Sequence, residues 1–475
     1  MRCRSWYAGL TVCVALGAAP ACAGELSWPT HRGNLQRTGS IDDRPGPRQP
    51  KVLWVYESRD HFVAAPVVAG DALLVSGLGP FNSAALYKLS LADEAPQRVL
   101  WEQHAPLLSQ PIVSPPCVVD GMIVFGDGMH QTDGGSLHCL SLVDGSALWQ
   151  LPLPGTLIHL EGSPTVADGQ VYIGAGNAGV VCAQMTRVVM EGVEQDLAAT
   201  VAARQARWKE LQAIYEKEKK EDPDFAIPPS AASLPQVAPK IVWQAGRDIW
   251  HVDASLAVAG DRVLVGSAFL DVEGVGHRAL LCLDAADGQV KWELPLDMNP
   301  WSGPTVSGNT VLIGCSSIRL DPAELRRGRG SVAACRLDDG RLLWSKAVPG
   351  GVVSPIAVVG DVAIFTATDG RVRAWNVSDG AERWSHDMGA AMFAGPAVAG
   401  DVVYVADLKG VVAALSLADG RPLWKMELAT EPAVKAPGMV YASPVVHGGR
   451  LYVATTTLGG PVDQQKTVVV CIGDK

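Results

Sequence analysis

The sequence predicts an all-β protein, an eight-bladed β-propeller of four-stranded antiparallel blades with one helical insertion. Two regularities support this fold. Tryptophans recur mostly 40 to 52 residues apart, usually just after an Asp-Gly pair, and short apolar runs separated by glycine turns precede them. Four strands every forty-odd residues are typical of a propeller blade. The recurring tryptophans are Trp54, Trp101, Trp149, Trp243, Trp292, Trp344, Trp384 and Trp424.

The seventh unit shows the pattern most clearly. Its apolar runs are "GPAVAG" (395–400), "DVVYVA" (401–406) and "GVVAALSL" (410–417), and its tryptophan follows in "RPLWKMEL". Alternating β-branched residues at this length, broken by turn residues, predict strands. We therefore expect each unit to fold as a four-stranded meander.

The two ends of the chain predict how the ring closes. The segment "KVLWVYE" (51–57) carries a tryptophan strand without three strands before it, whereas the C-terminal "SPVVHG", "RLYVAT" and "KTVVVCIG" supply three strands without a tryptophan. Together they make an eighth blade. Joining both termini in one blade removes the exposed strand edges that promote aggregation.

The repeated turn, "LADGRPLW" at 417–424 in the seventh unit, is interpreted as architecture and not as a ligand loop. Asp419 can bond its own backbone and Gly420 accepts positive φ, so the pair suits a tight turn. A large flat indole at one radius suits packing between neighbouring blades. A binding motif would hardly be needed eight times.

Composition and charge exclude several classes of partner. Hydrophobic residues make up 48% of the chain and charged residues only 19%, which is ample for a large core. The net charge of −10 argues against nucleic acid, which needs a basic face. The seven cysteines after residue 23 form no close pair, and Cys139, Cys182 and Cys282 fill a slot that is Ala374 or Ala414 elsewhere, so we expect a small buried strand position.

The N-terminus has the features of an export signal. Residues 1–23 combine Arg2 and Arg4 with an apolar run and the cleavage-like "ACA", which favours cleavage before Gly24 over lipidation of Cys22. The expected organisation is a signal peptide (1–23), an N-terminal extension (24–50) and the propeller (51–475). No later stretch is long enough to span a bilayer. We expect a monomer exported to the periplasm or cell envelope.

The pattern in "VAALSLADGRPLW" resembles the tryptophan-docking motif of the PQQ-like propeller family, which includes quinoprotein alcohol dehydrogenases and the assembly lipoprotein BamB. The segment "WPTHRGNLQRTGS" (28–40) is similar to the start of many bacterial PQQ-like repeat proteins. The resemblance covers almost all of the chain after the signal. It implies the fold strongly and the function weakly, because propellers host many functions.

One insertion interrupts the repeat at residues 187–239, within the third blade. Its core is rich in helix formers, and Leu197, Val201, Trp208, Leu211 and Tyr215 follow helical spacing. We expect an amphipathic helix, about residues 190–220, on the face opposite the inter-blade loops, with a Pro-rich return. It either packs on its own propeller or docks a partner, such as an envelope protein or polymer.

Chemistry is expected in the inter-blade loops, each of which joins the last strand of one blade to the innermost strand of the next and lines the mouth of the central funnel. Counting back five residues from the proline, or its equivalent, that starts each innermost strand gives His61, Gln110, His159, His251, Asn299, Gly350, Ala391 and Met439. Counting back three gives Glu161, Asp253, Trp301 and Tyr441 among apolar residues. The motifs "HLE" (159–161) and "HVD" (251–253) would then lie at one height, with two imidazoles and two carboxylates within reach.

Loops between the second and third strands share this face. They add His130 and Asp133, then Asp271, Glu273 and His277, then Arg319, Arg326, Arg327 and Arg329. Three interpretations stay open: a hydrated funnel without a ligand, a small-molecule or glycan pocket, and a metal or quinone site. The candidate ligand-binding residues are His61, His159, Glu161, His251, Asp253, Asn299, Trp301 and Tyr441; no catalytic residue or metal ligand is assigned.

Two functions follow from the resemblance. Quinoprotein dehydrogenases carry an adjacent Cys-Cys pair and often a CxxCH haem segment, and this sequence has neither. Glu161, Asp253 and Asn299 could still hold a cation beside PQQ, because Ca²⁺ needs several converging oxygens. The sequence therefore favours an exported, non-catalytic binding or scaffold propeller, with a PQQ- and Ca²⁺-dependent oxidoreductase for alcohols or sugars as the alternative.

Overall fold

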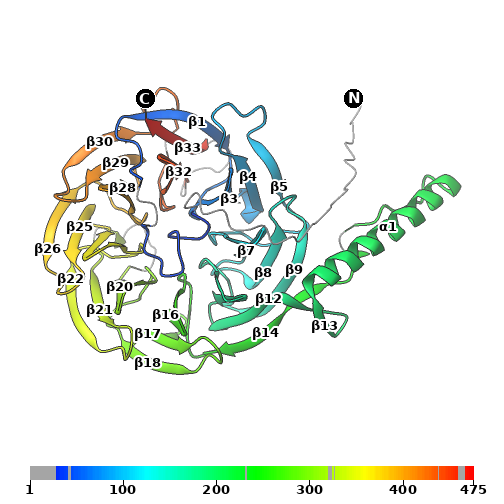
Figure 1. Cartoon of the computed structure of the whole chain (residues 1–475), viewed down its shortest axis with the longest axis horizontal. Coiled ribbons are helices and arrows are strands. Elements are labelled where there is room, and N and C mark those ends of the chain that lie inside the picture. The colour runs from blue at the N-terminus through cyan, green and yellow to red at the C-terminus, as the bar shows by residue number, and fades with distance from the viewer. Residues whose placement is uncertain are drawn as a thin grey trace.

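Eight antiparallel sheets are arranged as blades around a central axis in the described part of the chain (Figure 1). This computed structural model describes residues 28–40, 44–230, 233–318, 324–325, 327–436, 438–457 and 466–474. The predicted signal peptide lies outside these residues. The predicted fold class is confirmed, including the shared sheet of the two chain ends and the helical insertion.

Seven blades take their strands from consecutive stretches of chain, innermost strand first. Blades 1 and 2 consist of β2 (Val67–Ala69), β3 (Ala72–Leu78), β4 (Ala84–Ser90) and β5 (Val99–Gln103), then β6 (Cys117–Val119), β7 (Met122–Gly126), β8 (Asp133–Ser141) and β9 (Ala147–Thr156). Blades 3 and 4 consist of β10 (Thr165–Ala167), β11 (Gln170–Gly174), β12 (Val180–Met190), β13 (Val193–Asp196) and β14 (Val237–Ala245), then β15 (Ala257–Ala259), β16 (Arg262–Leu270), β17 (Val275–Asp284) and β18 (Val290–Pro295). Blades 5, 6 and 7 consist of β19 (Pro304–Ser307), β20 (Thr310–Ser316), β21 (Gly330–Arg336) and β22 (Leu342–Val348), then β23 (Ala357–Val359), β24 (Val362–Thr366), β25 (Arg371–Asn376) and β26 (Glu382–Asp387), then β27 (Ala397–Ala399), β28 (Val402–Ala406), β29 (Val411–Ser416) and β30 (Pro422–Glu427).

The eighth blade closes the ring with strands from both ends of the chain. Its inner strands are β31 (Val445–His447), β32 (Arg450–Ala454) and β33 (Thr467–Asp474), and its outer strand is β1 (Pro50–Ser58). Strand β1 runs antiparallel to β33, with Trp54 opposite Cys471. The small slot predicted for Cys139, Cys182 and Cys282 lies opposite the blade tryptophan in each case.

The blade tryptophans contact the neighbouring blade through their indole groups. Trp384 donates its Nε1–H to the carbonyl of Leu417, two residues before the Asp-Gly turn of the next blade, at 2.8 Å. Gly420 has φ of 69°, and a Cβ at this position would collide with the indole of Trp384. Only glycine satisfies both requirements. Equivalent indole bonds join Trp101 to Leu142, Trp149 to Met185, Trp243 to Ala285, Trp292 to Leu337 and Trp344 to Val377.

Residues 28–40, called the axial segment below, run around the inside of the ring (Figure 1, darkest blue). Six backbone carbonyls of the segment, from Trp28 to Gly39, accept hydrogen bonds from the innermost strands of blades 1, 2, 4, 5, 6 and 7. The donors are Val68, Val118, Val258, Val306, Val358 and Val398. Innermost strands otherwise present unpaired N–H groups to the axis, so the segment satisfies backbone groups that burial would leave without partners.

Two arginines of the axial segment are buried, with different surroundings. The guanidinium of Arg37 donates to carbonyls of Ser163, Pro164 and Leu256, to the carbonyl of His31, and to the hydroxyls of Thr30 and Thr165. Burial lowers the pKa of Arg37 to about 10, which leaves it charged at neutral pH. Arg32 is equally buried, but none of its guanidinium nitrogens has a hydrogen-bond partner within the described ranges.

The insertion forms the helix α1 (Leu197–Glu221), which projects away from the ring (Figure 1, green). Asp196 caps the helix by accepting from the backbone N–H of Ala198. Only Leu197 and Thr200 are buried, because contact with the propeller is concentrated in the first turns, near β12 and β13. The side predicted from the spacing is the less exposed one, because Leu197 is buried and Val201, Trp208, Leu211 and Tyr215 are half-buried, whereas charged residues crowd the second half of the helix.

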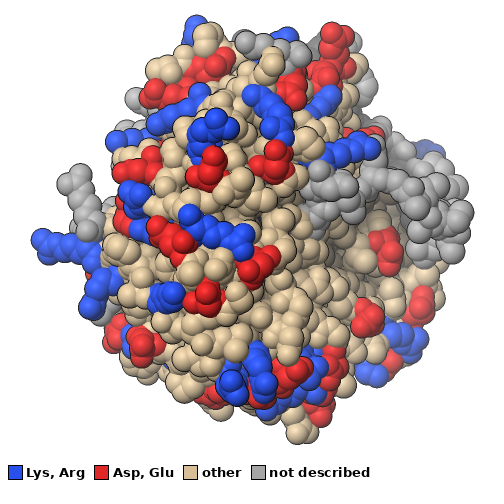
Figure 2. Space-filling view, turned by 60° about the vertical axis from the view of Figure 1, so that its left-hand side comes forward, with Lys and Arg blue, Asp and Glu red and all other residues tan. Residues whose placement is uncertain are grey.

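The outer side of the ring carries charged side chains of both signs. Basic and acidic side chains alternate over the part that includes β22, β26 and β30 (Figure 2). Among the described residues, no helix is long and apolar enough to cross a membrane.

Candidate functional site

The inter-blade loops place equivalent residues at one level of the funnel mouth. His61, His251, Asn299 and Met439 each form an isolated bridge with a residue near the end of the second strand of the blade they lead into. The partners are Leu78, Ala268, Ser316 and Thr456. These four residues therefore share one structural position in blades 1, 4, 5 and 8.

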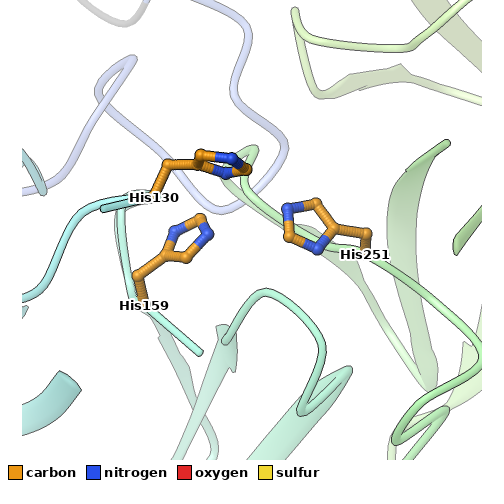
Figure 3. Close-up of side chains that lie close together, drawn as sticks. All are labelled: His130, His159 and His251. Atoms are coloured by element: carbon orange, nitrogen blue, oxygen red, sulfur yellow. The ribbon is translucent and has the colours of Figure 1, made fainter. Parts of the chain in front are cut away.

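Three histidines meet at the mouth between blades 2 and 4 (Figure 3). His130 comes from the β7–β8 loop, His159 from the loop leading to β10, and His251 from the loop leading to β15. The ring centroids are 5.3 Å apart for His159 and His251, and 5.7 Å apart for His130 and His159. One nitrogen from each of the three rings lies within 4.8 Å of the others.

Two carboxylates approach the same histidines. An oxygen of Asp253 lies 3.1 Å from Nε2 of His251 and 3.7 Å from Nδ1 of His159, and an oxygen of Glu161 lies 3.2 Å from Nδ1 of His159. Burial acts to raise the pKa of Asp253, but His251 and His159 outweigh it and lower the pKa to about 2. For His159, burial acts to lower the pKa, but Asp253 and Glu161 raise it above the ordinary value.

Backbone hydrogen bonds fix the loops that carry these groups. The N–H of Leu160 donates to the carbonyl of Asp127, and the N–H of His130 donates to the carboxylate of Glu161. Val252 and Gly176 exchange two backbone hydrogen bonds, which ties the "HVD" loop to the turn after β11. The cluster therefore sits on a braced frame and not on free loops.

Several buried polar atoms in the cluster have no hydrogen-bond partner. They are both ring nitrogens of His159, Nε2 of His251 and one carboxylate oxygen of Asp253. The rings of His159 and His251 are fully buried. Buried polar atoms nearly always have partners, and leaving one without a partner costs about 1–3 kcal/mol.

A sequence profile of one protein family matches most of the chain. It is described as outer membrane protein assembly factor BamB, and it covers residues 47–221, 237–324 and 325–469. The chain belongs to this BamB-like family of PQQ-repeat propellers. A search of curated proteins finds no significant match.

Solved structures with similar folds include a BamB protein and two dehydrogenases. BamB from Moraxella catarrhalis superposes with a TM-score of 0.57 at 15% identity, covering 89% of this chain and 97% of that one. Quinohemoprotein alcohol dehydrogenase from Comamonas testosteroni gives a TM-score of 0.61 at 13% identity, covering 95% and 81%. A europium-containing methanol dehydrogenase gives a TM-score of 0.62 at 13% identity, covering 94% of this chain and 98% of that one. At these identities the BamB-like propeller shares their fold, and its site must be judged on its own residues.

The other predicted inter-blade residues are engaged in the propeller's own structure. Nδ1 of His61 faces both the hydroxyl of Thr456 and the N–H of Thr457 at 3.2 Å. The amide of Asn299 bonds the backbone N–H and carbonyl of Phe269 and also accepts from Arg278. The structure therefore does not bring these two residues into the histidine cluster.

The aromatic candidates also lie outside the cluster. Nε1 of Trp301 donates to the carbonyl of Ile318 at 3.1 Å. Tyr441 packs edge-on against Phe393, with centroids 4.9 Å apart, and burial raises its pKa. The side of the mouth that blades 7 and 8 form is therefore aromatic and apolar.

The residues predicted in the loops between the second and third strands also fall into two sets, those that border the histidine cluster and those that do not. Glu273 lies 3.3 Å from Nε2 of His130 and so borders the cluster. Asp271 pairs with Arg278, and His277 pairs with Glu293, both away from it. Asp133 is exposed at the start of β8. Arg327 and Arg329 make backbone bonds at the blade 5 loop, whereas Arg319 and Arg326 lie outside the described residues.

Sequence reasoning missed three functional details of this BamB-like propeller. Asn177 accepts from Nδ1 of His251 at 2.7 Å, and a buried pair of Asp127 and His138 at 2.6 Å braces the loop that carries His130. The axial segment fills the axis below the cluster. The "GDGMH" motif contains Asp127 and was therefore a visible signal for the Asp127–His138 pair. No spacing rule points to Asn177 or to the axial segment.

The donor set does not fit the calcium and quinone of the family's dehydrogenases. Asn299, the predicted third oxygen ligand, already uses its side-chain oxygen for Phe269 and Arg278. The carboxylates of Glu161 and Asp253 face imidazole nitrogens, whereas Ca²⁺ takes six to eight oxygen ligands. The cluster is suited to a smaller, nitrogen-binding cation.

Proposed function

We propose that this BamB-like propeller is an exported, non-catalytic scaffold of the cell envelope that docks a protein partner through its helical insertion. Membership of a family described as an outer membrane assembly factor supports the general class. The projection of α1 from the ring is the observation that carries the proposal (Figure 1). A 25-residue helix that contacts its own propeller mainly through its first turns contributes little to the stability of the ring.

The tip of this arm offers an apolar contact. Phe225 and Ile227, just beyond the end of α1, are each 81% exposed. Burying a side chain of this size on a partner contributes about 1.5–3 kcal/mol. Charged residues at the end of α1, such as Lys219 and Glu221, surround the tip with a polar rim. An apolar centre with a polar rim is the common organisation of a protein interface.

Site-specific photo-crosslinking in the producing cells tests the proposal. A photoreactive phenylalanine analogue is placed at Phe225, and at Val272 as the control, because Val272 is equally exposed but lies in a loop of blade 4. We expect a discrete crosslinked protein species from position 225 and none from position 272. The same pattern from both positions, or no product from either, would contradict docking through the arm.

Removal of the arm gives an independent test. Residues 198–235 are replaced by a linker of about six glycine and serine residues, which can span the gap between β13 and β14. The ring should keep its far-UV circular dichroism and thermal transition, while the protein species identified by crosslinking at position 225 no longer co-purifies with the chain. Persistence of that species after the deletion would remove α1 from the proposal.

A further inference from the structure

We propose that His130, His159 and His251, with Asp253 beside them, form a binding site for one divalent first-row transition-metal ion, with Zn²⁺ as its representative. The site is independent of the proposed scaffold role. Three loops from three different blades converge on it, so only the folded ring can assemble the ligands (Figure 3).

The distances are close to those of a metal site. Two nitrogens that bind one Zn²⁺ tetrahedrally at about 2.1 Å lie about 3.4 Å apart. The three ring nitrogens lie within 4.8 Å of one another, so a pair of them needs to approach by at most about 1.4 Å to reach binding distance. His130 is the most exposed of the three and can make this adjustment, because its side chain is 41% exposed.

Buried polar atoms without hydrogen-bond partners support the site independently of the distances. Nε2 of His251, Nδ1 of His159 and one oxygen of Asp253 are buried without hydrogen bonds, and the Asp253 oxygen lies 3.1 and 3.7 Å from the two nitrogens. One cation placed among them would satisfy a lone pair of each ligand. A core histidine with a purely structural role, such as His61, has its own partners instead.

Asn177 orients His251 for metal binding. Nδ1 donates to the side-chain oxygen of Asn177 at 2.7 Å, so Nε2 faces Asp253 and the cluster. Metal-binding histidines commonly donate their second nitrogen to such an outer partner, which fixes the ring and its tautomer. Asn177 is therefore a positioning residue for the site.

The charge and donor types favour a transition metal over Mg²⁺ or Ca²⁺. Imidazole nitrogen suits Zn²⁺, Cu²⁺, Ni²⁺ and Fe²⁺, whereas the alkaline-earth ions take oxygen ligands. Asp253 places a carboxylate oxygen 3.1 Å from Nε2 of His251 and 3.7 Å from Nδ1 of His159, which adds an oxygen donor to the imidazole nitrogens. Glu161 and Glu273 add carboxylates on the side that faces solvent, where they can attract a cation into the mouth.

The site is open on one side. His159 and His251 are fully buried, whereas Glu161 is 30% exposed. The axial segment lies on the opposite side, since Arg37 binds the carbonyls of Ser163 and Leu256, a few residues after Glu161 and Asp253 along the chain. An ion would thus have a closed floor of protein and a coordination position reachable from solvent.

Isothermal titration with ZnCl₂ tests the site on the chain that begins at Gly24, after removal of metal by a chelator. We expect one high-affinity Zn²⁺ per chain. His251→Ala and His159→Ala should each weaken binding by about 100-fold or more, and Asn177→Ala by about 10–100-fold. His61→Ala is the matched control, because it occupies the same position in another blade, and should change the affinity by less than about twofold.

Co²⁺ gives a second readout that separates coordination from loss of fold. The Co²⁺-loaded protein should show visible ligand-field absorption that His251→Ala abolishes and His61→Ala retains, with circular dichroism confirming that both variants are folded. Asn177→Ala, which lies outside the ligand set, serves if an alanine at position 159 or 251 prevents folding. Failure of the parent chain to bind Zn²⁺, or equal affinity in all variants, would overturn the proposal.

Discussion

His61 and His251 occupy the same position in two inter-blade loops, yet their surroundings differ. Each forms the bridge that marks this position, to Leu78 and Ala268 respectively. His61 has Thr456 and Thr457 as partners for Nδ1, whereas His251 keeps Nε2 without one and faces Asp253. A repeat therefore supplies the position, and the neighbouring loops decide whether a side chain at that position is structural or available to a ligand.

The two buried arginines of the axial segment extend this comparison and give the largest expected effect. Arg37→Met removes a charged group with six hydrogen bonds and leaves buried carbonyls without donors. We expect the free energy of unfolding, measured in urea, to fall by about 3–5 kcal/mol.

Arg32→Met is the control for this prediction. Its guanidinium has no hydrogen-bond partner among the described residues, so its loss should cost less than about 1 kcal/mol or raise the stability. Equal losses of unfolding free energy in Arg32→Met and Arg37→Met would contradict the prediction that hydrogen-bond partners make Arg37 the more stabilising of the two arginines.

Zinc should stabilise the fold through His251 and not through His61. At free Zn²⁺ about 100 times the dissociation constant, the parent chain should gain about 2.7 kcal/mol of stability. His61→Ala should keep this gain and His251→Ala should lose it, as measured by urea unfolding with and without the ion. A gain that survives in His251→Ala would place the bound ion elsewhere.

The fold was predictable because the tryptophan repeat reports a contact that recurs in every blade. The positions of His159, Glu161, His251 and Asp253 were also predictable, because counting from the innermost strands uses the same repeat. Their convergence within 3.1–3.7 Å follows from two neighbouring loops at one level. His61 and Asn299 were equally good candidates by this count, because a sequence repeat gives a residue's position and not its hydrogen-bond partners.

Other features could not be predicted from the sequence, for identifiable reasons. The axial segment pairs through backbone carbonyls, which every residue has, so no side-chain pattern marks it. Trp208, Leu211 and Tyr215, whose spacing predicted the helix, are half-buried, but that spacing did not show that the helix projects from the ring. Helical periodicity predicted the helix itself and gave no information about its direction.

The axial segment has a consequence for the order in which the protein folds. Its carbonyls pair with strands from six blades, the last of which, β27, lies more than 350 residues further along the chain. The segment emerges among the first residues during synthesis, yet its set of partners is complete only after the seventh blade has formed. Contacts of such long sequence separation form slowly. Ring closure and the complete seating of this segment are therefore late events, and a chain arrested before blade 7 would leave the carbonyl of Gly39 without its strand partner.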